Sequence, residues 1–218
     1  MPSRWGDRRC RRIGLLGGSF NPAHAGHHHI AECAVRSLRL DEVWLLVSPG
    51  NPLKPSLGMA PFADRLASAQ RIAGGRLSAT DIEARFGTRY TVQTLALLHR
   101  RFPRTRFVLL VGADIPQQLP RWKRWWQLLR RTPLAVLPRP GETRRALAGR
   151  AMHCLAPWRR RPGALLAGSD RFQPRWCLIP AREHPASATA IRAALAEDTI
   201  WGTISDVTTD STTPRRQP

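Results

Sequence analysis

Two glycines and two histidines lie where a short apolar run gives way to a helix-like stretch near the start of the chain. Residues 13–16 form the apolar run, Gly17 and Gly18 follow it, and His24 and His27 begin the helix-like stretch. Side chains three residues apart share one face of a helix, and the first helical turn carries unpaired N–H groups that suit a phosphate. The spacing therefore predicts an anion site in which both imidazoles donate hydrogen bonds to phosphate.

Other chemistries fit this loop less well. The chain contains neither GxxxxGK[ST] nor GxGxxG, and Asn21 replaces the last glycine that a GxSxG nucleophile elbow requires. A zinc site on His24 and His27 is an alternative, although no HExxH motif or cysteine partner accompanies them. A purely structural role for the pair is a second alternative. His28 and His29 are assigned no chemistry.

The elements that must position these residues alternate between strands and helices. Short apolar runs predict buried strands, at 13–17, 43–47, 107–111, 134–137 and 176–179, with a weaker candidate in "RLSATDIEA" from Arg76. Helix-like segments lie at 25–39, 62–73, 91–101, 123–131 and 188–197. This alternation predicts an α/β fold with a doubly wound parallel sheet and right-handed crossovers. Such sheets bind ligands beyond the carboxyl ends of their strands, which is where the glycine–histidine loop lies.

The length of 218 residues predicts one domain with short extensions. We expect a basic flexible arm at 1–11, the domain at 12–204 and a disordered tail at 205–218. The Pro/Gly-rich stretch at 47–61 is long enough to be functional or disordered. The segment at 140–175 is rich in Arg, Gly and Pro and gives no clear pattern.

The charge balance is strongly basic, with 35 Lys and Arg against 15 Asp and Glu. Such a balance favours polyanionic partners, but nearly all the cations are scattered arginines, as in compositional bias, so we expect attraction of small phosphorylated substrates and no specific nucleic-acid partner. No apolar run approaches the ~20 residues of a membrane span, so we expect no membrane partner. The four cysteines are far apart and form no CxxC pair, which favours reduced thiols and a cytoplasmic location.

Two segments from opposite ends of the chain resemble one enzyme superfamily. "GGSFNPAHAGH" is similar to the first signature of nucleotidylyltransferases, with (H/T)xGH at His24, Gly26 and His27. "SATAIRAAL", from Ser187, is similar to the second signature, SxTxxR. Between them, "VSPGNPLK", "DIEARFGTRYTVQTL", "VGADIPQQLPRWKRWW" and "LAVLPRPG" look like the nicotinate-nucleotide adenylyltransferase family. The resemblance runs from about residue 13 to 195 and is weakest across 142–175.

The resemblance implies a single-domain Rossmann-like nucleotidylyltransferase fold and a specific reaction. The family joins nicotinate mononucleotide to the AMP half of ATP, which gives deamido-NAD and pyrophosphate on the path to NAD. The acceptor phosphate supplies its own nucleophile, so we expect direct in-line attack without a covalent enzyme intermediate. Positioning of two reactants can contribute roughly 7–11 kcal/mol. Mg²⁺ should arrive with ATP, bound by phosphate oxygens and water, and no metal-binding residues are assigned.

The resemblance also assigns the phosphate-binding residues. His24, His27 and Arg192 form the catalytic set, with His27 at the transition state and the Arg192 fork on the leaving phosphates. The implied ATP-binding residues are Gly17, Gly18, Ser19, Phe20, Lys54, Gly112, Asp114, Ser187, Thr189 and Arg192. An exposed loop lysine remains the alternative for Lys54, and a helix N-cap remains the alternative for Asp114. Arg139, in "LPRPG", is placed near the nucleotide.

Recognition of the acceptor is implied to involve Ser19, Tyr90, Thr91 and Trp122. An aromatic side chain would stack on the pyridine ring, while Thr91 and backbone N–H groups hold the carboxylate. An ionised carboxylate only accepts hydrogen bonds, whereas an amide also donates them. A site that offers only donors can therefore select nicotinate over nicotinamide. A core position is the alternative for Trp122.

The chain departs from its relatives at three positions near these motifs. Asn21 stands where many relatives have aspartate, Ala188 replaces a common serine, and Gln93 replaces a frequent aspartate. A transferase acting on phosphopantetheine is the nearest enzyme alternative, and a nucleotide-binding regulator without catalysis, or a basic RNA binder, is a different class. The expected partners are ATP and nicotinate mononucleotide, and homo-oligomer formation is left open.

Overall fold

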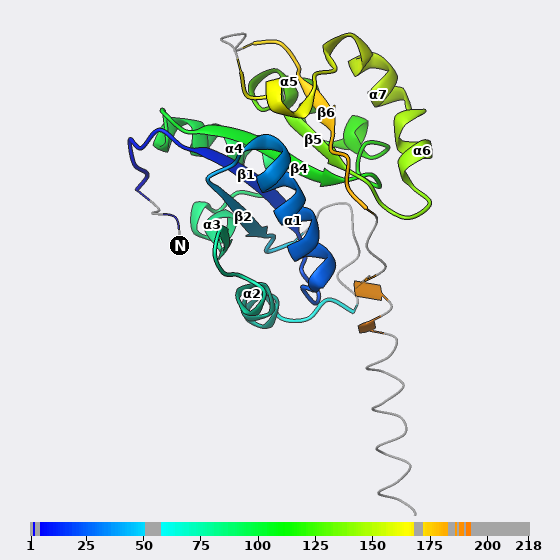
Figure 1. Cartoon of the computed structure of the whole chain (residues 1–218). Coiled ribbons are helices and arrows are strands. Elements are labelled where there is room, and N and C mark those ends of the chain that lie inside the picture. Colours follow the sequence, from blue (N-terminus) through cyan, green and yellow to red (C-terminus); the bar gives the residue numbers. More distant parts are fainter. Residues whose placement is uncertain are drawn as a thin grey trace, which may run out of the picture.

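Six parallel strands form one sheet in the described part of the chain. The computed structural model describes residues 2, 5–50, 58–167, 172–182, 186, 188–189 and 191–192. The strands are β1 (Arg12–Gly18), β2 (Glu42–Val47), β3 (Leu77–Thr80), β4 (Arg106–Gly112), β5 (Leu134–Leu137) and β6 (Trp176–Leu178). Their order is β3-β2-β1-β4-β5-β6, and every neighbouring pair is parallel. The predicted doubly wound parallel sheet is confirmed (Figure 1).

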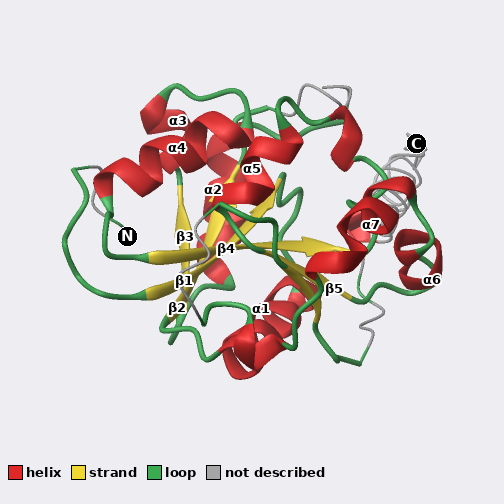
Figure 2. Ribbon diagram, turned by 90° about the horizontal axis from the view of Figure 1, so that it is seen from above, coloured by secondary structure: helices red, strands yellow, loops and turns green. Residues whose placement is uncertain are grey.

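Helices cover both faces of this sheet. They are α1 (Ala25–Leu38), α2 (Phe62–Arg71), α3 (Ile82–Phe86), α4 (Thr91–Arg101), α5 (Trp125–Arg131), α6 (Thr143–Leu147) and α7 (Arg150–Leu155), with 3₁₀ turns η1 (Leu119–Arg121), η2 (Ala156–Trp158) and η3 (Pro162–Ala164). Figure 2 shows α3, α4 and α5 on one face and α1 on the opposite face. A strand covered on both faces must be apolar along its whole length, which explains the uninterrupted runs seen in the sequence.

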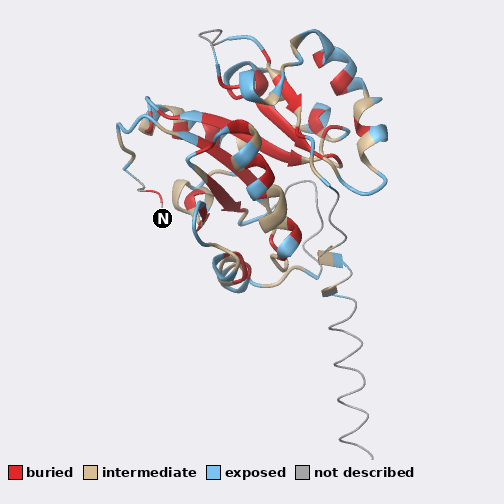
Figure 3. Cartoon of the chain, viewed as in Figure 1, coloured by how far each residue is buried: buried red, intermediate tan, exposed pale blue. Residues whose placement is uncertain are grey.

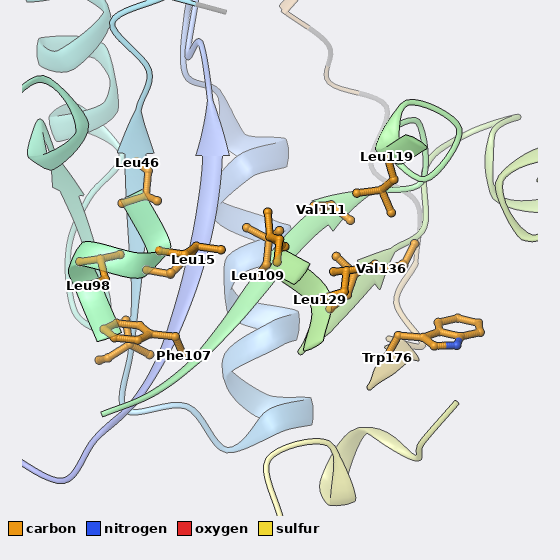
Figure 4. Close-up of a cluster of buried hydrophobic side chains, with 14 of the residues drawn as sticks. Leu15, Leu46, Leu98, Phe107, Leu109, Val111, Leu119, Leu129, Val136 and Trp176 are labelled. Atoms are coloured by element: carbon orange, nitrogen blue, oxygen red, sulfur yellow. The ribbon is translucent and has the colours of Figure 1, made fainter. Parts of the chain in front are cut away.

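The strands carry the core between the two helical layers, as the buried residues in Figure 3 show. Leu15 of β1, Leu46 of β2 and Leu109 of β4 point to the α4 and α5 face, where they meet Leu98 and Leu129 (Figure 4). An aromatic group closes one end of this cluster. The Trp44 ring lies 5.4 Å from Phe102 and 5.8 Å from Phe107, centroid to centroid.

The strand order places the functional edge of the sheet. Chain connections leave β1 toward β2 on one side, while β4 lies on the other side of β1. In sheets of this order, ligands bind beyond the carboxyl ends of the strands at the point where the order reverses. The loops that follow β1 and β4 are therefore the two expected to border a ligand.

The structure differs from the sequence expectations in a few segments. The weak strand from Arg76 ends at Thr80, and α3 occupies the rest of that segment. The helix expected from 123 begins at 125, because Arg124 has a left-handed φ of 52°. The unclear 140–175 region contains α6, α7 and two 3₁₀ turns. None of the helices in the described ranges is long and apolar enough to cross a membrane.

Several expected segments lie partly or wholly outside the described residues. The tail at 205–218 does so, as do residues 193–197 of the expected last helix and residues 51–57 of the long loop. In the expected arm, Arg11 forms an ion pair with Glu42 at 2.6 Å, and the Arg9 carbonyl accepts a hydrogen bond from Thr105. The domain bounds stay a prediction.

Replacing Phe107 by alanine should strongly destabilise the fold. The Phe107 ring is 1% exposed and packs against Trp44, His99 and Phe102. Loss of a buried phenylalanine costs about 3–5 kcal/mol of unfolding free energy, measurable by urea unfolding. Phe172→Ala is the matched control, because that side chain is 63% exposed and should change stability by less than about 0.5 kcal/mol. Equal effects of the two substitutions would contradict this account of the core.

Candidate functional site

The two glycines at the end of β1 have different surroundings. A Cβ on Gly17 would meet no atom within 4 Å, whereas a Cβ on Gly18 would lie 3.2 Å from the Phe20 ring. Gly18 therefore makes room for Phe20, whereas the backbone of Gly17 borders open space. Phe20 itself has a left-handed φ of 50° and is 2% exposed. Its ring is buried, and the ATP-binding role of Phe20 stays a prediction.

The two histidines lie side by side at the start of α1. Their ring centroids are 3.9 Å apart, and the Phe20 ring packs 4.9 Å from that of His27. The backbone N–H of His24 donates to Nδ1 of His27 at 3.2 Å. His24 is 8% exposed. The two imidazoles lie together at the start of α1, as expected, and the Phe20 ring packs against that of His27.

His27 is a neutral hydrogen-bond donor in this arrangement. Burial, followed by the neighbouring His24 and the Arg139 guanidinium, lowers the pKa of His27 from 6.5 to about 3. The ring is therefore uncharged at neutral pH. Because Nδ1 accepts the His24 N–H, the single ring proton belongs on Nε2. The fold thus fixes both the protonation state and the tautomer, which leaves Nε2–H to donate to an anion.

Gly26, between the two histidines, lets a distant segment approach α1. A Cβ at this position would lie 2.9 Å from Nδ1 of His24 and 3.3 Å from the carbonyl oxygen of Ala186. Any larger side chain would displace one of the two. The absence of a side chain at Gly26 therefore allows the segment around Ala186 to approach the start of α1.

The second signature lies against the loop after β1. Arg192 Nη1 donates to the backbone carbonyl of Asn21 at 2.6 Å, and its Nη2 lies 3.3 Å from Oγ1 of Thr189. The ring Nε2 of His29 and the carbonyl of Arg182 are 3.0 Å apart, so the same segment also follows α1. The structure thus brings Thr189 and Arg192 to the loop that carries the histidine pair. Ser187 and Lys54 lie outside the described residues.

The loop after β4 contributes an acidic side chain that is already paired. Oδ2 of Asp114 forms an ion pair with Nη1 of Arg139 at 2.9 Å. A Cβ on Gly112 would lie 2.6 Å from Oδ1 of the same carboxylate, so a larger residue here would displace the Asp114 side chain. The following 3₁₀ turn begins after Gln118, so Asp114 is not its N-cap. Arg139 follows β5. Its positive charge also helps to lower the pKa of His27.

The residues assigned to the pyridine ring surround the start of α4. Tyr90 is the N-cap of α4 and Thr91 its first residue. The Tyr90 N–H donates to Oε1 of Gln93 at 3.2 Å, so the glutamine that replaces aspartate caps this helix. Lys123 Nζ lies 4.5 Å from the Tyr90 ring centroid. Trp122 is half-buried against the core, so a stacking role and a packing role both remain open for it.

Asn21 has a physical reason to differ from aspartate. Its Nδ2 donates to the Gly58 carbonyl at 2.9 Å, while its Oδ1 accepts the Ala60 N–H at 3.2 Å. An aspartate could accept the second bond but could not donate the first. The amide thus ties the loop after β1 to the chain that enters α2.

Two polar residues near the candidate site have no clear signal in the sequence. Arg65 is buried in α2, and Glu83 is half-buried in α3. Burial raises the pKa of Glu83 to about 7, against a smaller lowering by the hydrogen bond from Thr94. The Thr94 hydroxyl lies 2.8 Å from that of Thr88, so Glu83 secures the loop before α4. Arg65 looks in the sequence like any of the exposed arginines, and only burial distinguishes it.

The described residues contain no group of three or more His, Cys, Asp or Glu side chains that could hold a metal ion. The Asp114 carboxylate in the loop after β4 is engaged by Arg139. Imidazole, guanidinium and backbone N–H groups are all donors that suit phosphate oxygens.

Comparisons with known proteins place this arrangement among nucleotidyltransferases. A cytidylyltransferase-like family model matches residues 15–194. The chain is 58% identical over 184 residues to a probable nicotinate-nucleotide adenylyltransferase of Gluconobacter oxydans (strain 621H), covering 83% of this chain and 93% of that protein. A second, from Gluconacetobacter diazotrophicus, is 54% identical over 193 residues, covering 87% and 89%.

A solved structure shows the same fold. The Plasmodium falciparum nicotinic acid mononucleotide adenylyltransferase complexed with NaAD matches with a TM-score of 0.61 at 16% identity, covering 84% of this chain and 83% of that chain.

Glu83→Gln should change how stability depends on pH. The Glu83 pKa is about 7 in the folded protein against an ordinary value of 4.5, so the folded state binds the proton more tightly. The wild type therefore loses stability as pH rises from about 4.5 to about 7. Glutamine does not titrate and keeps an acceptor for Thr94. Relative to the wild type, the variant should gain on the order of 3 kcal/mol between pH 4 and pH 8, measured by urea unfolding. A difference that stays flat across this window would refute the raised pKa.

Proposed function

The chain belongs to the nicotinate-nucleotide adenylyltransferase family, and we propose that the loops after β1 and β4, with the segment around Arg192, catalyse its reaction by direct in-line attack. The enzyme transfers the adenylyl group of ATP to nicotinate mononucleotide in NAD biosynthesis. A phosphate oxygen of the mononucleotide forms a bond to the α-phosphorus, the bond from that phosphorus to the bridging oxygen breaks, and pyrophosphate leaves. No enzyme residue becomes covalently attached in this step.

One observation supports the proposal above the others. The Arg192 guanidinium donates a hydrogen bond to the carbonyl of Asn21. Asn21 precedes His24 by three residues. A triphosphate at this place would meet imidazoles on one side and a guanidinium on the other. Arg192 and Thr189 would hold the departing β- and γ-phosphates, because a planar guanidinium matches phosphate oxygens.

His27 would act at the transferring phosphoryl group as a neutral donor. Its Nε2–H is free of the intramolecular bond that Nδ1 makes with His24. A donor aimed at charge that develops in the transition state contributes about 3 kcal/mol. The Gly17 and Gly18 backbone and Ser19 would border the acceptor or α-phosphate, where a Cβ on Gly17 would meet only open space. Gly112 and Asp114, with its partner Arg139, would border the adenosine half of ATP.

The acceptor would lie toward the start of α4. Tyr90 or Trp122 would stack on the pyridine ring, and the Thr91 hydroxyl with nearby N–H groups would hold its carboxylate. The Lys123 ammonium over Tyr90 adds positive charge on that side. Donors without acceptors would favour the acid over the amide.

Mg²⁺ is proposed to accompany ATP. When bound, it neutralises charge on the phosphates, and its preferred ligands are phosphate oxygens and water. We also propose that the enzyme works in the cytoplasm, as its widely spaced cysteines suggest. Its basic composition would attract the substrates without specific nucleic-acid binding. Homo-oligomer formation stays an open prediction.

The enzyme should prefer one acceptor. With Mg-ATP and nicotinate mononucleotide, we expect pyrophosphate release and formation of deamido-NAD. Nicotinamide mononucleotide and phosphopantetheine should each give a kcat/KM at least about tenfold lower, because a site built from donors leaves an amide imperfectly paired. Coupled measurement of pyrophosphate with each acceptor tests this. Faster turnover of phosphopantetheine would reassign the substrate.

His27→Ala should lower kcat by about 10²–10³-fold, the range for loss of one donor at developing charge, while circular dichroism shows the fold intact. His28→Ala is the matched control, since that neighbouring side chain faces Glu32 on the surface of α1. It should keep kcat within about twofold. A His27 variant with near-normal kcat would remove His27 from the catalytic set.

A further inference from the structure

Arg65 is a buried cation held by backbone carbonyls. It lies in α2 and is 3% exposed. Its guanidinium donates to four carbonyl oxygens, those of Ser19 at 2.9 Å, Ser48 at 2.7 Å, Pro49 at 3.3 Å and Ala60 at 3.0 Å. Among the described residues no carboxylate pairs with it. Burial lowers the pKa of its guanidinium, in the direction expected for a charge taken out of water.

These carbonyls belong to three separate segments at the carboxyl edge of the sheet. Ser19 follows β1, Ser48 and Pro49 follow β2, and Ala60 precedes α2. Neutral amides make the bonds, so the positive charge of Arg65 is not cancelled. A lysine offers three donors from a single point, whereas the guanidinium fork can reach carbonyls that converge from several directions.

The Ser19 contact connects Arg65 to both halves of the proposed site. Phe20, the next residue, supports the His27 ring at 4.9 Å. Asn21, the residue after that, accepts the Arg192 guanidinium and also binds Gly58 and Ala60. A shift of the Ser19 backbone would therefore move the support of His27 and the anchor of Arg192 together.

We infer that Arg65 is a positioning residue for adenylyl transfer, which fixes the loop after β1 relative to the loop after β2 and holds uncancelled positive charge beneath the phosphate site. This inference rests on the proposed function of that site. It differs from a purely structural role in one measurable respect. A structural role lowers stability only, whereas a positioning role lowers kcat and weakens phosphate binding in protein that remains folded.

The test compares Arg65→Lys with Arg71→Lys, a change of the same kind at an exposed position of the same helix. Lysine keeps the charge and much of the volume, so Arg65→Lys should fold. Its kcat/KM for both substrates should fall about 100-fold, the effect expected of a 1 Å misplacement, divided about equally between a lower kcat and a higher KM. Arg71→Lys should stay within twofold. Thermal unfolding sets an assay temperature at which every variant is folded.

Three results would overturn the inference. They are kinetics of Arg65→Lys within threefold of the wild type, an equal loss in Arg71→Lys, or failure of Arg65→Lys to fold, which would assign Arg65 to the fold alone. A wild type that releases no pyrophosphate would instead refute the proposed function. In that event, calorimetric titration with ATP still tests Arg65, because Arg65→Lys should weaken ATP binding at least about tenfold while Arg71→Lys does not.

Discussion

The contact between the Arg192 guanidinium and the Asn21 carbonyl is the interaction on which the proposed site depends. It joins residues 171 positions apart across a distance of 2.6 Å. The strand order makes the contact feasible, because β1 is central and the chain leaves the sheet from the edge strand β6. From there it follows α1, past His29 and Gly26, to the loop after β1. If the chain did not return to this loop, the histidines and Arg192 would lie apart on the surface.

Two guanidinium groups in this region are bound in the same way. Arg65 and Arg192 are held by carbonyl oxygens, and no carboxylate pairs with either among the residues described. Carbonyl dipoles orient a guanidinium without cancelling its charge, so the charge remains available to phosphate. His27, in contrast, carries no charge at neutral pH. The same positive surroundings and burial keep it neutral, which preserves a donor and avoids a second buried charge. In the proposed site, this arrangement would gather hydrogen-bond donors for a polyanion without adding a second buried charge.

The sequence predicted the fold well where patterns are local, and less well elsewhere. Uninterrupted apolar runs indicated the strands, since both faces of the sheet are covered. The start of α5 was placed two residues early because a left-handed Arg124 has no clear sequence signal. The short helices α6 and α7 were missed because their Arg- and Gly-rich composition lacks a long apolar period. For the candidate site, the resemblance predicted roles for His24, His27 and Arg192, which stay predictions. Arg65 and Glu83 escaped notice, because burial and not residue type sets them apart.

By itself, the sequence determined the parallel α/β architecture, the two signature segments and the family to which they belong. Those properties depend on periodicity and on short motifs, which are written in neighbouring residues. Only the tertiary structure decided which carbonyls Arg65 binds, which ring nitrogen of His27 carries the proton, and why asparagine suits position 21. Each of these is settled by the dielectric surroundings and donor geometry of groups far apart in the chain, and no local pattern encodes them.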